Sequence, residues 1–386
     1  MSSIRAAILS EGKLSAYFLT MIIGFLLLFH LVPSSKIVNN YYYIFMFAPA
    51  FFAIYLLRNR LDLRRPETIL WGLLFLLCVL SAGSWNYIKH IVYTAVFLLI
   101  VSRIIPGDFF RISVIVRGIF WIKIIHVFVS MVFYGWLGDY VIGGQLHGPL
   151  GPVKMNCILT SIILSACLML VLPFWIAEKR WVELGTGLIL SIVSSVYILQ
   201  SRSGLVAMLA IFILIPGYLW HMRRLRLYMA GLMLVVVLLM CLVIWITPDF
   251  VSRMDSGRFE MWQNLLIDWK QCGYLSGCGG GFQIQRTFEA GGFYNHTHNI
   301  YFAFAFYNGL PAAFVFIGLC FYLLHKAWKN RDPWGGYLLS TMIGLNFDGG
   351  QIISNPSPLW IAILLPMAMI SNSKRGHAAE ERIQSL

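Results

Sequence analysis

Long apolar stretches separated by short polar connections constrain this chain more than any other feature. Of its 386 residues, 59% are hydrophobic and 12% are charged, and the apolar residues form continuous runs. A helix that crosses a bilayer needs roughly 20 such residues. A soluble core cannot bury this apolar excess, and continuous runs do not fit the alternating pattern of a transmembrane β-barrel. The sequence therefore predicts an integral membrane protein built from helices.

The apolar stretches predict an all-α, polytopic transmembrane bundle of about twelve spans, forming one membrane domain over residues 1–386. A long polar segment, 248–298, separates the ninth span from the tenth and is expected to carry part of an active site. The expected spans are 15–33, 41–57, 67–84, 87–104, 112–134, 157–176, 182–199, 203–220, 227–247, 299–324, 336–353 and 357–371.

The basic residues predict how the chain is oriented. The formal net charge is +13, and most of the 29 Lys and Arg residues lie in alternate connections, for example at 58–65 and 223–226. Cytoplasmic connections of membrane proteins carry such an excess. Both termini are therefore expected to be cytoplasmic, and 248–298 is expected to face outward. The orientation of the spans thus explains the positive charge. We therefore expect membrane lipids as partners and no nucleic acid.

Two cysteines lie in the outward segment, Cys272 and Cys278. An exoplasmic compartment is oxidising, so a disulfide that closes this short turn is compatible with the sequence. Two free thiols in a tight turn fit the sequence equally well.

An arginine stands at the outer end of the eighth predicted span, where the positive-inside rule disfavours it. Arg202 lies in the sequence Gln-Ser-Arg-Ser-Gly at 200–204. Such a residue can anchor a span by reaching to the interface, whereas its small neighbours leave space for a ligand. We interpret Arg202 as a candidate for binding an anion.

A short helix is predicted to start near Arg258 in the outward segment. Apolar residues recur at helical spacing from Phe259 to Trp269, Ser256 is placed to cap the helix, and Gly273 is placed to end it. This helix would lie along the membrane surface and hold Arg258 over the outer ends of the spans. The alternative is a solvated arginine on a surface helix.

A glycine-rich turn at 277–281 follows, and Arg286 lies just beyond it. Backbone N–H groups of such a turn can bind an anion, although the turn lacks the Lys and Ser/Thr of a nucleotide-binding loop. Arg286 either assists that binding or is a plain loop charge.

The outward segment ends in His296-Thr297-His298-Asn299, directly before the tenth span. A neutral imidazole at this position can accept a proton near physiological pH, as a general base requires. A zinc site needs a third ligand, and the rest of the segment offers no His or carboxylate at metal spacing. We therefore expect no metal, and Asn299 can also act as a helix cap.

Polar residues also fall inside predicted spans. Lys123, His126 and Ser130 share one helix face in the fifth span, where structural pairing is the favoured interpretation and a wet cavity is the alternative. Asp348, near the outer end of the eleventh span, is placed either to balance an arginine or to orient an imidazole.

Several motifs together resemble the O-antigen ligase family. They are Ser-Arg-Ser-Gly at 201–204, Gly-Arg-Phe-Glu-Met-Trp at 257–262, the glycine-rich turn, and His298-Asn299 followed after nine residues by Gly309. The stretch at 148–156, Gly-Pro-Leu-Gly-Pro-Val-Lys-Met-Asn, is similar to a Gly/Pro/Asn stretch of that family. The chain departs from the family pattern at Ala312, where a further Gly is expected.

This resemblance implies an enzyme of the Gram-negative inner membrane. It would transfer a glycan from undecaprenyl diphosphate to a lipid A-core hydroxyl on the periplasmic face, with inversion and without nucleotide, metal or other cofactor. Permanently charged arginines suit a diphosphate leaving group. By matching position, the resemblance assigns catalysis to His298. We assign diphosphate binding to Arg202 and Arg258, and we take Arg286, His296, Asn299 and Asp348 as candidates for supporting roles.

Two alternatives stay open. An O-antigen polymerase would use the same lipid diphosphate donor with a glycan as acceptor, and it often carries an Arg followed after nine or ten residues by Gly, a spacing this chain lacks in its outward segments. A polytopic transporter or flippase would explain the spans but gives the outward Arg and His residues no role.

Overall fold

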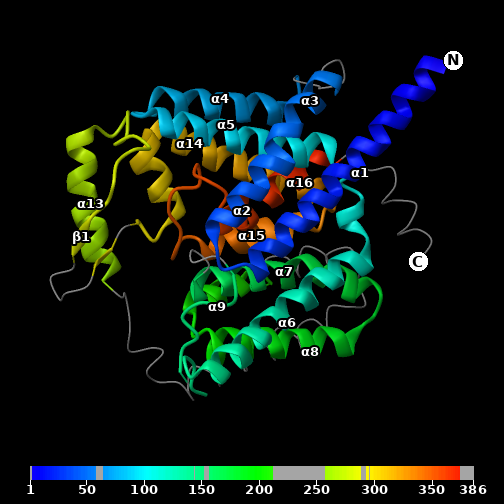
Figure 1. Cartoon of the computed structure of the whole chain (residues 1–386). Coiled ribbons are helices and arrows are strands. Elements are labelled where there is room, and N and C mark those ends of the chain that lie inside the picture. The colour runs from blue at the N-terminus through cyan, green and yellow to red at the C-terminus, as the bar shows by residue number, and fades with distance from the viewer. Residues whose placement is uncertain are drawn as a thin grey trace.

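The computed structural model describes residues 2–57, 64–142, 144–151, 156–211, 257–287, 293–294 and 296–373. Within these residues the chain is a bundle of helices with one short β-ladder, in which β1 (Arg286–Thr287) pairs antiparallel with β2 (Phe293–Tyr294). Figure 1 shows most of the long helices running alongside one another. The helical segments are α1 (Ser2–Leu31), α2 (Ser35–Tyr41), η1 (Tyr42–Phe47), α3 (Ala48–Leu57), α4 (Pro66–Leu80), α5 (Trp85–Leu99), η3 (Ile100–Ile104), η4 (Phe109–Arg111), α6 (Ser113–Leu137), α7 (Cys157–Ala177), α8 (Trp181–Val193), η5 (Ser194–Ile198), α9 (Arg202–Met208), α13 (Arg258–Cys272), α14 (Ile300–Lys329), α15 (Trp334–Gly344), η6 (Trp360–Leu364) and α16 (Leu365–Asn372).

The protein is a helical, multi-pass membrane protein. Among the described residues, 7 helices are long and apolar enough to cross a membrane, and each predicted span that falls within these residues contains a helix. The predicted span 227–247 and most of 203–220 lie outside the described residues. The 7 long helices are Gly12–Leu31, Ser35–Leu56, Trp85–Ile104, Ser113–Leu137, Cys157–Ala177, Trp181–Ile198 and Ile300–Lys329.

The span predicted at 336–353 is wrong in its extent. Its helix, α15, ends at Gly344, and the residues that follow form a linker at 345–359. Asn346 turns back to donate to the carbonyls of Met342 and Ile343, so its amide competes with continuation of the helix. Asp348 therefore lies in this linker and not in a helix.

Helix α7 is the centre of the bundle. It packs against α6, α8, α9 and α15, and 83% of the residues in its apolar 18-residue stretch are buried inside the protein. Small residues allow α9 to approach closely: a Cβ on Gly204 would collide with Ser161, and Ser165 Oγ donates to Gly204 O at 2.8 Å. Close packing of small residues and hydrogen bonds between helices are the forces available where lipid replaces water.

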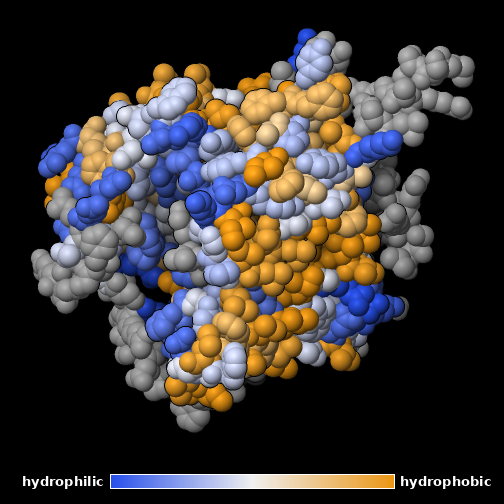
Figure 2. All heavy atoms as spheres, in the orientation of Figure 1, coloured by the Kyte–Doolittle hydropathy of each residue, from blue (hydrophilic) through white to orange (hydrophobic). Residues whose placement is uncertain are grey.

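The helix ends meet in two groups. In the first, Ser15 Oγ donates to Ile104 O at 2.8 Å, and Arg111 pairs with Asp332 at 2.6 Å. The second group, which we call the α13 end, contains the capped starts of α7 and α14 together with the linker 345–359. Figure 2 shows an apolar surface over the middle of the bundle, with hydrophilic residues gathered toward both ends.

The polar residues predicted to share one face of the fifth span form a structural network. Lys123 Nζ lies 3.4 Å from His126 Nδ1, and His126 Nε2 lies 2.6 Å from Leu150 O. Ser130 Oγ accepts from Leu150 N at 2.9 Å. These contacts hold the loop 144–151 against α6, which places the start of α7 at the α13 end.

A kink in α14 prepares the docking site for the turn 277–281. Gly309 has φ 80° and ψ 165°, far from helical values, and Pro311 has no N–H to donate. Leu310 N donates outside the helix, to Tyr274 O at 3.0 Å. The carbonyls of Phe306 and Tyr307 therefore lose their partners within α14.

The glycine-rich turn 277–281 supplies the missing partners. Cys278 N donates to Phe306 O at 2.7 Å, and Gly279 N donates to Tyr307 O at 3.0 Å. The expectation that this turn cradles an anion is thus wrong for these two N–H groups, because α14 occupies them. The turn is a plug that joins the segment 257–287 to α14.

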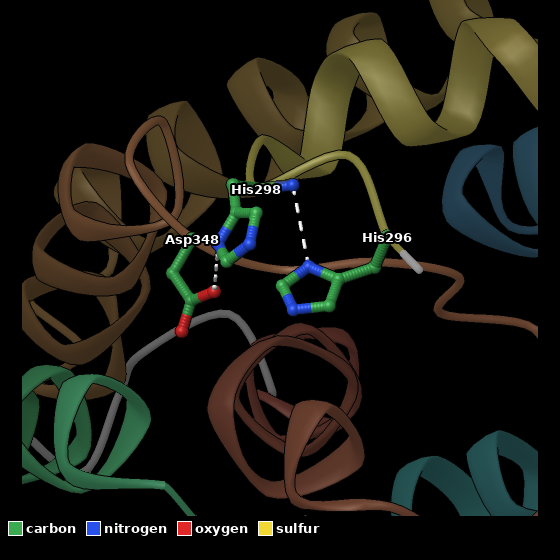
Figure 3. A group of neighbouring side chains, drawn as sticks. All are labelled: His296, His298 and Asp348. Carbon is green, nitrogen blue, oxygen red and sulfur yellow. Dashed lines mark hydrogen bonds and ion pairs between the residues drawn. The ribbon is translucent and has the colours of Figure 1, made fainter. Parts of the chain in front are cut away.

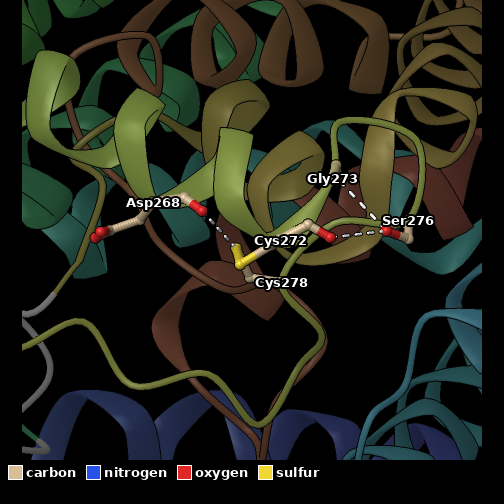
Figure 4. The surroundings of a disulfide bond; sticks show 5 residues. All are labelled: Asp268, Cys272, Gly273, Ser276 and Cys278. Atoms are coloured by element: carbon tan, nitrogen blue, oxygen red, sulfur yellow. Dashed lines mark hydrogen bonds between the residues drawn. A yellow bond between two sulfur atoms is a disulfide. The ribbon is translucent and has the colours of Figure 1, made fainter.

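A disulfide between Cys272 and Cys278 ties the end of α13 to this plug (Figure 4). Ser276 Oγ donates to Cys272 O at 3.1 Å across the same turn. A disulfide that closes so short a loop adds about 2 kcal/mol by restricting the unfolded chain. The bond fixes the C-terminal end of α13 relative to the kink in α14.

Candidate functional site

The segment His296–Asn299 is held on two sides. Trp262 Nε1 of α13 donates to Thr297 O at 2.8 Å. Thr297 is fully buried, and its hydroxyl donates to Asn299 O at 2.9 Å. This arrangement brings the imidazoles of His296 and His298 together, with their ring centroids 3.7 Å apart.

Asn299 fixes the main chain directly after His298. Its Oδ1 accepts from Tyr301 N and Phe302 N, each at 2.9 Å, so it caps α14 as expected. Its Nδ2 donates to Asn346 O at 3.1 Å, which ties the cap to the linker 345–359. His298 itself has φ 49°, a left-handed conformation that costs a non-glycine residue free energy and is found often at functional sites.

His298 faces a buried carboxylate. Its Nδ1 lies 3.4 Å from Asp348 Oδ1, and Figure 3 shows the two side chains pointing toward each other. The Asp348 side chain is 3% exposed, and the His298 side chain is 26% exposed. Asn156, the cap of α7, donates to Asp348 Oδ2 at 3.4 Å. The carboxylate is thus set between a helix cap and an imidazole that keeps access to solvent.

The surroundings keep Asp348 ionised. Burial acts to raise the pKa of this carboxyl, but its contact with His298 and the nearby His296 more than offset burial, and the pKa lies below its ordinary value. Burial, His298 and Arg258 together lower the pKa of His296. At neutral pH the site thus holds an ionised carboxylate and a neutral His296.

Arg258 lies close enough to His296 for its charge to affect that imidazole. It is the first residue of α13, as predicted, although the cap position is Gly257 and the expected cap, Ser256, lies outside the described residues. Arg202 begins α9, at the same end of the bundle. Arg286 lies in β1, and β2 precedes His296 by two residues.

The structure brings a third possible metal ligand, Asp348, to the two histidines. One atom each from His296, His298 and Asp348 lie within 4.8 Å of one another, a separation that a metal ion could bridge. However, His296 Nδ1 already accepts from His298 N at 3.3 Å, and Arg258 adds a positive charge beside the group. The positive charge of Arg258 offsets the negative charge of Asp348, which weakens the attraction of the group for a cation.

Sequence reasoning missed two features of this site. It did not single out Asn156, although an Asn directly before a long apolar run is a helix-cap signal. It also placed Asp348 within a span and left its partner open, because fifty residues separate it from His298. No protein-family model matches the chain, and no curated protein matches it.

If His298 acts as a general base, Asp348→Asn should lower kcat by roughly a hundredfold or more, because an amide cannot stabilise a positively charged His298. Since the pKa of Asp348 is lowered, its carboxylate stays ionised at neutral pH, and the stability it adds is lost only as the pH falls through that lowered pKa. The pH–rate profile of the variant should shift along with kcat. Asp139→Asn, an exposed carboxylate just after α6, is the control and should change neither quantity. Equal kcat in the two variants would remove Asp348 from the mechanism.

Proposed function

We propose that this membrane protein is a glycosyltransferase that uses a lipid diphosphate-linked sugar donor, and that it acts as an O-antigen ligase. The observation that carries the proposal is the pairing of His298 with Asp348 at the α13 end, with Arg258 beside them. An imidazole backed by a carboxylate is the arrangement of a general base, and an arginine binds phosphate oxygens. The motif resemblance to O-antigen ligases supplies the substrate class.

In the proposed reaction, His298 Nε2 accepts the proton of an acceptor hydroxyl. The hydroxyl oxygen attacks the anomeric carbon, the bond from that carbon to the diphosphate breaks, and the electron pair leaves with undecaprenyl diphosphate. Asp348, facing Nδ1, orients the ring and stabilises the imidazolium that forms. Arg258 and Arg202 neutralise the diphosphate as it leaves. Attack opposite to the leaving group inverts the sugar carbon.

The location follows from the same proposal. The enzyme would lie in the inner membrane of a Gram-negative bacterium, with cytoplasmic termini and a periplasmic active site. Its donor would be an undecaprenyl diphosphate-linked glycan and its acceptor a lipid A-core hydroxyl. Transfer would need no cofactor, since base, orienting carboxylate and phosphate-binding arginines all come from the chain.

The decisive experiment supplies purified protein in lipid vesicles with a lipid-linked glycan donor and a lipid A-core acceptor, without an ion gradient. Formation of the joined product, unaffected by EDTA, is the expected result. Growth of the donor glycan without joining would assign the protein to the polymerases. Movement of lipid-linked glycan without any transfer would make it a flippase. Loss of transfer with EDTA, restored by zinc, would make His296, His298 and Asp348 a metal site.

Replacing Arg258 by lysine is expected to raise the KM for the lipid diphosphate donor by roughly tenfold. A lysine keeps the charge but loses the two parallel hydrogen bonds that a guanidinium makes to phosphate. Initial rates at varied donor concentration measure the effect. Lys270→Gln, at the exposed far end of α13, should leave the donor KM unchanged. A wild-type donor KM in Arg258→Lys would contradict diphosphate binding by this residue.

A further inference from the structure

The surface of the bundle has a polar pocket that the proposed reaction does not use. Its volume is about 460 Å³, within the range of small-molecule sites. Its walls come from η1, the first turns of α5 and the linker 345–359. The lining residues are Tyr43, Asn86, Lys89, His90, Tyr93 and Asn355.

One face of α5 supplies most of the pocket. Asn86, Lys89, His90 and Tyr93 stand at positions i, i+3, i+4 and i+7, so they share one stripe of the helix. These residues are exposed or half-buried, although a span facing only lipid would present apolar side chains along such a stripe. The start of α5 therefore has a polar face that a ligand could contact.

A pair of aromatic rings joins this face to the wall that η1 supplies. The rings of Tyr43 and Tyr93 lie 4.9 Å apart, and Tyr43 OH donates to Asn355 Oδ1 at 2.9 Å. That bond uses the amide oxygen of Asn355 and leaves its NH₂ group as a donor for a ligand. Aromatic rings beside amide donors suit a sugar, which has apolar ring faces and polar hydroxyl groups.

The charge of the pocket is positive. Lys89 is exposed and forms no ion pair within the part of the chain that the structure describes. The lining described above contains no Asp or Glu. A lysine without a carboxylate partner, beside a histidine, favours a ligand that carries phosphate or carboxylate.

The linker 345–359 connects this pocket to the candidate active site. Gly350 packs against His296, since a Cβ on it would lie 3.3 Å from His296 Cβ. Gln351 Nε2 then donates to Gly280 O at 3.0 Å. Asn355 follows Asp348 by seven residues, which span at most about 25 Å of extended chain. Asn355 therefore lies within about 25 Å of Asp348, a separation that an oligosaccharide of several sugars can span.

We propose that this pocket binds the acceptor, and that it recognises a sugar bearing a phosphate or carboxylate group some distance from the hydroxyl that reacts. The acceptor role rests on the proposed function. The preference of the pocket for an anionic sugar does not rest on the proposed function, because it follows from the lining residues alone.

Binding is tested first, without donor and therefore without turnover. The probe is a lipid-free oligosaccharide that carries a phosphate monoester, compared with the same oligosaccharide lacking it, titrated by calorimetry into the full chain in lipid nanodiscs. We expect the phosphate to tighten binding about tenfold and Lys89→Gln to remove that gain. Lys36→Gln, an exposed lysine on α2 outside the pocket, should keep it. Equal binding of the two probes to the wild type, or an unchanged gain in Lys89→Gln, would overturn the pocket assignment.

Transfer then tests the acceptor role. In the vesicle assay, Lys89→Gln and Tyr93→Ala should each raise the acceptor KM about tenfold and leave the donor KM and kcat unchanged. A rise in the donor KM would overturn the acceptor assignment. If the wild type joins no glycan while the phosphate still tightens probe binding, the proposed function fails and the anionic-sugar site stands.

Discussion

Replacing His298 by alanine is expected to lower kcat by roughly a hundred- to ten-thousandfold, because positioned general bases contribute that much to rate. His298 faces Asp348 through Nδ1, which leaves Nε2 to take the proton of the acceptor hydroxyl. The main chain around His298 is held by the Asn299 cap and by Trp262, and neither contact uses the imidazole. Folding and donor binding should therefore survive the substitution. Single-turnover transfer and donor binding, measured on the same preparation, separate the two effects.

The control lies on α14, the helix that follows His298. His325 is exposed near the far end of α14, and His325→Ala should transfer glycan at the wild-type rate. A His298→Ala protein that retained near-normal kcat would show that another group accepts the proton, and the catalytic assignment would have to be abandoned.

Replacing Gly309 by alanine is expected to destabilise the protein by about 3 kcal/mol or more. With φ 80°, this position favours glycine, and a Cβ would lie 1.9 Å from Leu275 O. Relieving the clash requires the plug 277–281 to leave the carbonyls of Phe306 and Tyr307, which would then be buried without partners. Thermal unfolding in detergent, followed by tryptophan fluorescence, measures the loss.

Gly318 is the control for that substitution, because it also lies in α14 and a Cβ there meets nothing within 4 Å. Gly318→Ala should be neutral or slightly stabilising, since alanine favours a helix more than glycine by about 1 kcal/mol. Equal unfolding temperatures for the two variants would mean that the plug does not depend on the kink.

The helices could be predicted from hydropathy because each described span is an apolar run, and the bounds of α13 followed from the spacing of its apolar residues and from Gly273. The buried face of α13 was harder to predict. Phe259 and Leu266 are exposed, whereas Met261 is fully buried. Hydrophobicity alone cannot distinguish a face that packs on protein from one that meets lipid.

The candidate site was predictable only in part. His298 stood out because polar residues directly before a membrane span cost free energy unless they have a function. Its partner Asp348 did not stand out, because it lies in a stretch whose apolar flanks resemble a helix. The role of the glycine-rich turn was also hidden in the sequence. It depends on carbonyls that Gly309 and Pro311 release in a helix that comes later in the chain.

The plug and the kinked helix have a consequence for comparing or recombining proteins of this architecture. Neither the turn 277–281 nor the kinked part of α14 completes its backbone hydrogen bonds without the other. Residues 272–311 should therefore be exchanged together, although hydropathy would divide them between a loop and a span. A chimera whose crossover falls between the loop and the helix should fail to accumulate, whereas one that exchanges the whole stretch should be inserted and retained.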